Sequence, residues 1–248
     1  NSSKVMAILS SVDLQKVLNI TPAKFPHYPA DLELPQQRLE INQQGGTWSQ
    51  LFDRVALINS NPLLSIIFWY FSISLFGWLL YPFVRLVLGG LVDRGFAFSK
   101  LAAMLLLALI VWLAGSNGVA VSRVFIFGVV CALSLIGIIL GIIQRKEIAI
   151  DLKTNKEYFI WVELIGLLLF GFFLLVRIGN PDLWHPAKGG EKPMDFAYLN
   201  AVIKSTTFPP YDPWYAGGYI NYYYYGFVIV GVWVKLLGII PSTAYNLI

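Results

Sequence analysis

Residues 123–143 read RVFIFGVVCALSLIGIILGII, a segment whose one charged residue is Arg123 at its start. An α-helix rises about 1.5 Å per residue, so a segment of this length can cross the roughly 30 Å hydrocarbon core of a bilayer. Of the 248 residues in the chain, 57% are hydrophobic and 13% are charged, a balance that soluble globular domains do not show. We therefore expect an all-α, polytopic membrane protein whose first partner is the lipid bilayer.

Further apolar segments lie on both sides of this one. Together they predict about five transmembrane helices, over residues 63–92, 101–115, 123–143, 158–178 and 222–240. We expect Pro82 to end or kink the first of them near an interface, since proline removes a helical hydrogen bond.

The chain divides near residue 62. Residues 1–61 carry balanced charges and several prolines, and they predict a soluble segment at the tail of an upstream portion, with short helices near 11–18 and 35–43. Residues 62–248 predict the N-terminal part of a transmembrane domain. The remaining helices of a longer chain are then expected partners.

Basic residues in short loops predict the orientation, because such loops stay in the cytoplasm. The connectors at 92–100 and 144–157 fall on one side, which we expect to be cytoplasmic. The N-terminal segment, the turn near Asn117 and the loop at 180–221 are then extracytoplasmic, in a multi-pass protein of the plasma (inner) membrane. The net charge of +4 is explained by this topology, so we expect no nucleic acid as a partner. The basic residues of the cytoplasmic side are Arg85, Arg94, Lys100, Arg145, Lys146, Lys153 and Lys156.

The loop at 180–221 is polar and aromatic and holds most of the chemically interesting side chains. Asp195 precedes an amphipathic segment in which Phe196, Leu199 and Ile203 share one face, and this predicts a juxtamembrane helix lying in the interface. Asp195 is either the N-cap of that helix or a carboxylate that removes a proton from an acceptor hydroxyl. Both roles are compatible, since hydrogen bonds at a cap lower a carboxyl pKa.

Glu191 lies four residues before Asp195, so the two carboxylates could share a divalent cation such as Mg or Mn. No cofactor is certain from this pair, because no third ligand follows in the sequence.

The fourth span contains two charged residues, Glu163 and Arg177, about 21 Å apart along a helix and therefore unable to pair. Charges in a membrane are often functional, and the alternative is that each side chain reaches the nearer interface. Arg177 points toward the acidic loop. We assign no other charge to the interior of the spans, and this argues against a transporter.

The loop also presents aromatic faces and hydrogen-bonding groups suited to a sugar. The alternative for its tyrosines is an aromatic belt at the membrane boundary. His185, next to proline and tryptophan, is either a structural hydrogen-bonder or an acid or base. The predicted substrate-binding residues are Arg177, His185, Lys192, Asp212, Trp214, Tyr215, Tyr219, Asn221 and Tyr222.

Three motifs at residues 189–198, 208–214 and 217–224 (GGEKPMDFAY, FPPYDPW and GGYINYYY) resemble the signature of the YYY-type multi-pass membrane protein family of archaea and some bacteria, which is largely uncharacterised. That family is similar to the GT-C membrane glycosyltransferases. The resemblance implies a polyprenyl-phosphate sugar as donor, a glycan or protein as acceptor, and Asp195 as the catalytic acid or base with Glu191 as its helper.

Two hypotheses follow. The first is a GT-C-like glycosyltransferase that works at the extracytoplasmic membrane face. The alternative is a noncatalytic membrane scaffold module that binds a glycan or a lipid through its aromatic residues.

Overall fold

The computed structural model describes residues 36–43, 48–183, 190–215 and 217–248. The chain separates into two compact units, Asn1–Glu33 and Leu34–Ile248, and every described residue lies in the second. The helix predicted near 11–18 therefore lies outside the described residues. Helix α2 (Gln36–Gln43) matches the one predicted at 35–43.

Four helices of the described chain are long and apolar enough to cross a membrane. They match the first four predicted spans and confirm an all-helical, multi-pass class of protein. In these ranges the sole β-pairing is an isolated antiparallel bridge between Tyr211 and Tyr219. The four helices are α5 (Pro62–Val87), α6 (Ser99–Ser116, preceded by the 3-10 turn η3 at Phe96–Phe98), α7 (Arg123–Ile143) and α9 (Lys156–Gly179).

The fifth predicted span contains a shorter helix, α11 (Tyr225–Leu237). Its 13 residues reach about 20 Å, less than the roughly 30 Å of a bilayer core. The helix ends at Gly238, whose φ of 70° is the left-handed conformation that glycine adopts without a side-chain clash. The count of five spans stays a prediction.

Helix α5 continues through Pro82 to Val87, so Pro82 does not end the helix, and the alternative that it kinks the helix stays a prediction. Leu80, Tyr81 and Val84 are buried around the proline, and their packing offsets the lost backbone hydrogen bond. In the following loop Asp93 accepts hydrogen bonds from the backbone N–H groups of Gly95 (3.1 Å) and Ala97 (2.8 Å).

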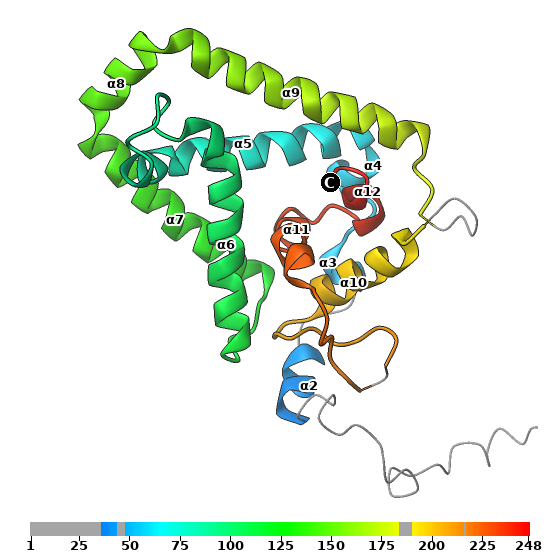
Figure 1. The fold of residues 1–248 in the computed structure, drawn as a ribbon. Coiled ribbons are helices and arrows are strands. Elements are labelled where there is room, and N and C mark those ends of the chain that lie inside the picture. Colours follow the sequence, from blue (N-terminus) through cyan, green and yellow to red (C-terminus); the bar gives the residue numbers. More distant parts are fainter. Residues whose placement is uncertain (1–35, 44–47, 184–189, 216) are drawn as a thin grey trace, which may run out of the picture. The chain divides into compact units, whose positions relative to one another are not determined.

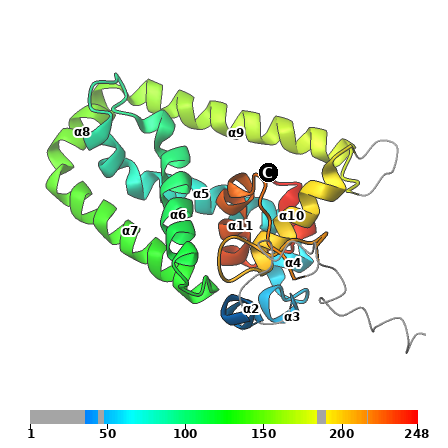
Figure 2. The same cartoon turned by 60° about the horizontal axis from the view of Figure 1, so that its bottom comes forward.

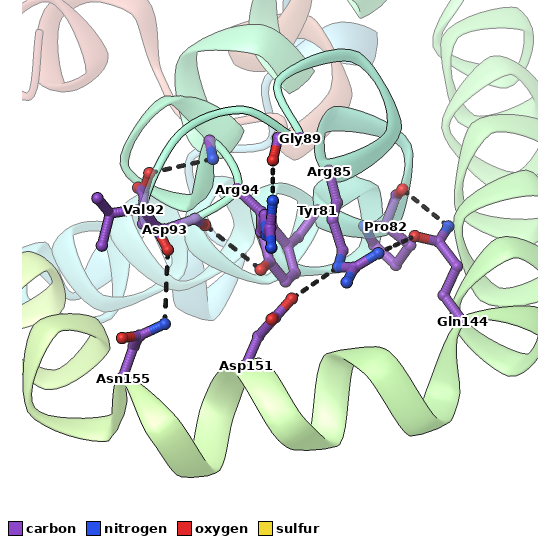
Figure 3. Close-up of polar contacts among 11 residues, drawn as sticks. Tyr81, Pro82, Arg85, Gly89, Val92, Asp93, Arg94, Gln144, Asp151 and Asn155 are labelled. Atoms are coloured by element: carbon purple, nitrogen blue, oxygen red, sulfur yellow. Dashed lines mark hydrogen bonds and ion pairs between the residues drawn. The ribbon is translucent and has the colours of Figure 1, made fainter.

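The predicted connector at 144–157 is itself largely helical, as α8 (Arg145–Thr154), and it packs back on the end of α5. Arg85 Nε lies 2.8 Å from Asp151 Oδ2, and Arg85 Nη1 donates to Gln144 Oε1 at 3.1 Å. Gln144 Nε2 in turn donates to the carbonyl oxygen of Pro82 at 3.1 Å (Figure 3). Asn155 Nδ2 also donates to the carbonyl oxygen of Val92 at 3.4 Å, and this contact joins the two connectors predicted to be cytoplasmic.

Helix α5 packs against both α6 and α7, and glycines allow the close approach. A Cβ built on Gly137 of α7 would lie 2.0 Å from the carbonyl oxygen of Leu79, and one built on Gly77 of α5 would lie 2.9 Å from Lys100 Cα. The helix backbones therefore meet where a side chain would not fit.

Glu163 of α9 forms an ion pair with a residue of another helix. Its partner is not Arg177, as the distance along the helix predicted. Its Oε2 lies 2.6 Å from Lys100 Nζ of α6, and its Oε1 accepts a hydrogen bond from Trp78 Nε1 of α5 at 3.0 Å. Tertiary packing brings in a cation from another helix, which spacing along the chain could not reveal. Whether this pair lies at the membrane interface stays a prediction.

The loop at 180–221 meets the turn between α6 and α7. Val121 N donates to Thr206 O at 2.7 Å, and Phe208 N donates to Gly115 O at 3.2 Å. The two segments predicted to be extracytoplasmic thus lie at the same end of the helices. Which end faces the cytoplasm stays a prediction.

Helix α10 (Lys192–Lys204) carries the acid pair, and it packs on α11, which also contacts α6 and α7 (Figures 1 and 2). A Cβ on Gly231 of α11 would lie 3.0 Å from Val202 and 3.8 Å from Leu199 side-chain atoms. The prediction that this apolar face meets the membrane interface is wrong for Leu199 and Ile203, because α11 covers them.

Candidate functional site

The two carboxylates lie one turn apart at the start of α10. Glu191 is the N-cap residue, and Asp195 N donates to Glu191 O at 3.0 Å. The prediction that Asp195 is the N-cap is therefore wrong. The helix begins a turn earlier, at Lys192, because Pro193 next to it has a φ already suited to a helix and lacks an N–H that would need a partner.

Burial raises the pKa of the Asp195 carboxyl above its usual value, and the charge of Glu191 raises it further. This reverses the lowered pKa that a capping role predicted, because burial removes hydration from the charged carboxylate. A carboxyl with a raised pKa takes up a proton more readily near neutral pH, as a general base must.

Several tyrosines of this region interact electrostatically with its carboxylates. The negative charges of Asp195 and Glu191 both interact electrostatically with the Tyr223 hydroxyl. The Tyr223 ring lies next to that of Tyr222, with the two centroids 4.2 Å apart. Burial raises the pKa of Tyr198, with smaller contributions from the Asp212 charge and from Tyr222. The structure therefore brings three predicted site residues, Asp195, Asp212 and Tyr222, to the same tyrosine-rich surface.

Arg177 lies in the last turn of α9, next to Tyr245. Its guanidinium carbon lies 5.6 Å from the ring centroid of Tyr245, a residue of α12 (Pro241–Tyr245). The pKa of Tyr245 is raised by burial and by the Asp195 charge, and lowered by the Arg177 charge. Tyr245 is thus under the influence of both the predicted phosphate-binding cation and the predicted catalytic acid.

An apolar groove leads to Arg177. It has a volume of about 170 Å³ and is lined by Phe170, Phe173 and Leu174 of α9 together with Asn246. Aromatic and aliphatic walls that end at a guanidinium are suited to an amphipathic molecule with an anionic head.

Lys192 does not present a free ammonium to the loop. Its Nζ donates to the carbonyl oxygens of Asp182 at 3.2 Å and of Asn180 at 3.5 Å, so it connects the start of α10 to the end of α9. Asp212 is also engaged, because its Oδ1 accepts a hydrogen bond from Trp214 N at 2.8 Å.

The remaining predicted residues divide by exposure. Trp214 is 68% exposed, Tyr222 is 61% exposed, and Asn221 is also exposed. Tyr215 and Tyr219 are half-buried, and Tyr219 forms the bridge to Tyr211. His185 lies outside the described residues.

In the described part of the chain, no third protein ligand joins Glu191 and Asp195 to form a metal site. In the described ranges no three Asp, Glu, His or Cys side chains form a group that could hold a metal ion. Two carboxylates do not make a complete protein site, so a divalent cation stays a prediction.

Sequence reasoning missed the basic pair beneath the loop. Lys235 of α11 is buried, and its Nζ donates to Val121 O at 2.5 Å and to Ser205 O at 3.1 Å. Arg123 Nε donates to Lys235 O at 2.8 Å, and Arg123 Nη2 donates to Leu51 O. The assignment of only Glu163 and Arg177 to span interiors was therefore wrong. The signal was present, since Lys235 is a lone charge within the predicted span at 222–240.

Comparison with known protein families identifies a membrane protein family. A family model described as an uncharacterised membrane protein (DUF2298) matches residues 106–248, from within α6 through α12, and so takes in the acid pair and Arg177. No curated protein and no solved structure matches the chain.

Proposed function

The chain belongs to the DUF2298 family of uncharacterised membrane proteins, and we propose that it is a GT-C-like glycosyltransferase, which transfers a sugar from a polyprenyl-phosphate donor at the extracytoplasmic face of the plasma membrane. The proposal rests on Tyr245, which interacts electrostatically with both Arg177 and Asp195. Tyr245 thereby interacts electrostatically both with a cation that could receive a lipid phosphate and with a carboxylate that could receive a proton.

The donor approaches along the groove of Phe170, Phe173 and Leu174. Its polyprenyl chain contacts these apolar side chains, and its phosphate pairs with the guanidinium of Arg177. Arginine suits this role because its planar fork of N–H donors matches a phosphate. Lys192, whose ammonium already binds two backbone carbonyls, holds the start of α10 in place next to the end of α9.

In the transfer step an acceptor hydroxyl attacks the anomeric carbon of the sugar. The new C–O bond forms as the bond from that carbon to the phosphate oxygen breaks, and the phosphate leaves with the electron pair. Asp195 takes the proton of the hydroxyl, while Arg177 stabilises the negative charge on the leaving phosphate. Glu191 assists by raising the pKa of Asp195, which improves that carboxylate as a base.

Aromatic and polar side chains of the loop hold the sugar. Tyr222 and Trp214 are exposed and offer ring faces to sugar C–H groups, while hydroxyl and amide groups bind the sugar hydroxyls. The residues that we assign to the polar contacts are Asp212, Tyr215, Tyr219 and Asn221, with His185 on the adjoining segment.

The test is transfer by the full-length protein in liposomes that contain a polyprenyl-phosphate sugar and a hydroxyl acceptor. We expect Asp195→Asn to lower the transfer rate by about 10²-fold or more, since a general base contributes about 10²–10⁴-fold. Glu147→Gln, which neutralises an exposed carboxylate of α8, is the matched control and leaves the rate unchanged. Equal transfer by wild type and Asp195→Asn would exclude Asp195 as the base.

The exposure of Trp214, Tyr222 and Tyr223 favours a second candidate, a noncatalytic module that binds a glycan or a lipid. For that module we expect glycan binding to survive loss of both carboxylates and to fail in Trp214→Ala or Tyr219→Ala. The same variants therefore separate the enzyme from the scaffold.

A further inference from the structure

A second pocket lies on a different flank of α10 from the acid pair. It has a volume of about 440 Å³, and Phe196, Asn200 and Lys204 of α10 line one wall. These residues are four apart and share a helix face. The nine residues from Asp195 to Lys204 make about two and a half helical turns, so the two side chains lie on opposite faces of α10.

The pocket is basic. Arg54 and Lys204 both line it, and no acidic side chain does. Neither cation forms an ion pair with a described residue. Lys204 Nζ lies 5.8 Å from the ring centroid of Tyr211, another wall residue, and this cation–π contact favours a position of the ammonium over the ring. The pocket is therefore suited to a negatively charged ligand.

Asn200 adds an unused acceptor. Its Nδ2 donates to Phe196 O at 2.7 Å, while its Oδ1 is buried. Within the described part of the chain no donor reaches Oδ1. A buried oxygen without a hydrogen bond is costly, so it favours a ligand that brings a hydroxyl group.

The aromatic walls are held in place before any ligand arrives. The Trp48 ring packs on Phe52, with centroids 4.8 Å apart. Tyr211 N donates to Ser205 Oγ at 3.1 Å, and Tyr211 pairs with Tyr219. Because these side chains are already ordered, less conformational entropy is lost when a ligand binds.

We infer that this pocket binds a phosphate ester of a polyol, with the phosphate between Arg54 and Lys204 and a ligand hydroxyl donating to Asn200 Oδ1. Such a group occurs both in phospholipid headgroups and in soluble polyol phosphates. The inference does not depend on glycosyl transfer, because none of the three contacts involves the acid pair.

The test measures binding by the full-length protein in two arms. In the soluble arm, calorimetry follows glycerol 3-phosphate binding to protein in phosphatidylcholine nanodiscs. In the lipid arm, native mass spectrometry counts the phosphatidylglycerol molecules retained from mixed phosphatidylcholine–phosphatidylglycerol nanodiscs. The arm that shows binding identifies the source of the phosphate.

We expect Arg54→Gln and Lys204→Gln each to weaken binding about tenfold or more, since each removes a charge-assisted hydrogen bond. Lys204→Arg retains the charge and retains binding, which shows that loss in Lys204→Gln is not a folding defect. Lys146→Gln removes an exposed charge on α8 and leaves binding unchanged. Absence of binding in both arms, or binding that is equal in wild type and in the two Gln variants, overturns the inference.

Discussion

Lys100 Nζ of α6 lies 2.6 Å from Glu163 Oε2 of α9, and this ion pair joins two helices that are long enough to span a membrane. Both side chains are only about a quarter exposed. Phe159 is the buried residue of α9, so this helix has little other packing within the described chain. The ion pair is therefore a main attachment of α9 to the rest.

We expect Glu163→Ala to lower the free energy of unfolding by about 1–3 kcal/mol. Loss of one partner of a buried pair costs about 3–5 kcal/mol, and partial exposure reduces this. The double variant Lys100→Met/Glu163→Leu should recover most of the loss, because no charge is then left without a partner. Thermal unfolding in detergent measures the effect, with Glu157→Ala, an exposed acid on the same helix, as control. If Glu163→Ala and Glu157→Ala lowered the free energy of unfolding equally, the prediction would be contradicted.

Gly137 supports the close approach of α7 to α5. In Gly137→Ala the new methyl group would collide with the Leu79 carbonyl oxygen, and we expect a loss of about 1–3 kcal/mol from overpacking. Gly128 lies on the same helix, and a Cβ at its position would meet no other atom within 4 Å. Gly128→Ala should therefore be neutral or stabilise by up to about 1 kcal/mol. Unfolding midpoints that fall equally in both variants would argue against this contact.

Arg85 holds α8 against the end of α5 through Asp151 and Gln144. We expect Arg85→Met to speed amide hydrogen exchange in α8, because Asp151 and Gln144 lose their shared partner. Arg145→Met removes an exposed charge from α8 itself and should leave the exchange rates unchanged. The prediction fails if exchange in α8 is the same in wild type and Arg85→Met.

The raised pKa of Asp195 has a consequence for stability that does not require activity. The folded pKa exceeds the unfolded one, so the folded protein binds more protons and the protonated carboxyl stabilises it. This contribution is full below the unfolded pKa and is lost as the pH rises through the folded pKa. We expect Asp195→Asn to gain stability over wild type as the pH rises through that interval. Unfolding midpoints measured across acidic to neutral pH test this, and a constant difference would contradict it.

Hydropathy alone predicted the four long helices, because a segment of about twenty apolar residues must satisfy its backbone within one helix in lipid. It did not predict where α10 begins or what covers it. Helix starts depend on local conformation at single residues such as Pro193, and the burial of Leu199 depends on a glycine of α11 more than thirty residues away.

For the candidate site, the sequence identified the residue types but not their neighbours. Asp195, Glu191 and Arg177 stand out as charges beside apolar segments. That the charges of Arg177 and Asp195 both act on Tyr245 follows from the packing of α12, which carries this tyrosine. The pocket of Arg54 and Lys204 likewise joins residues 150 positions apart, which no spacing rule connects.

The sequence by itself determined that this protein is helical, crosses a membrane several times and carries a polar, acidic loop between apolar helices. Those properties depend on composition and on hydrogen bonds within each segment, so they do not require contacts with distant segments. Only the tertiary structure decided that Glu163 pairs with Lys100, that Lys235 is buried beneath the loop, and that the charges of Arg177 and Asp195 both act on Tyr245. Such relationships depend on contacts between distant segments, and a charge acquires its role only from the groups that packing brings within a few ångströms.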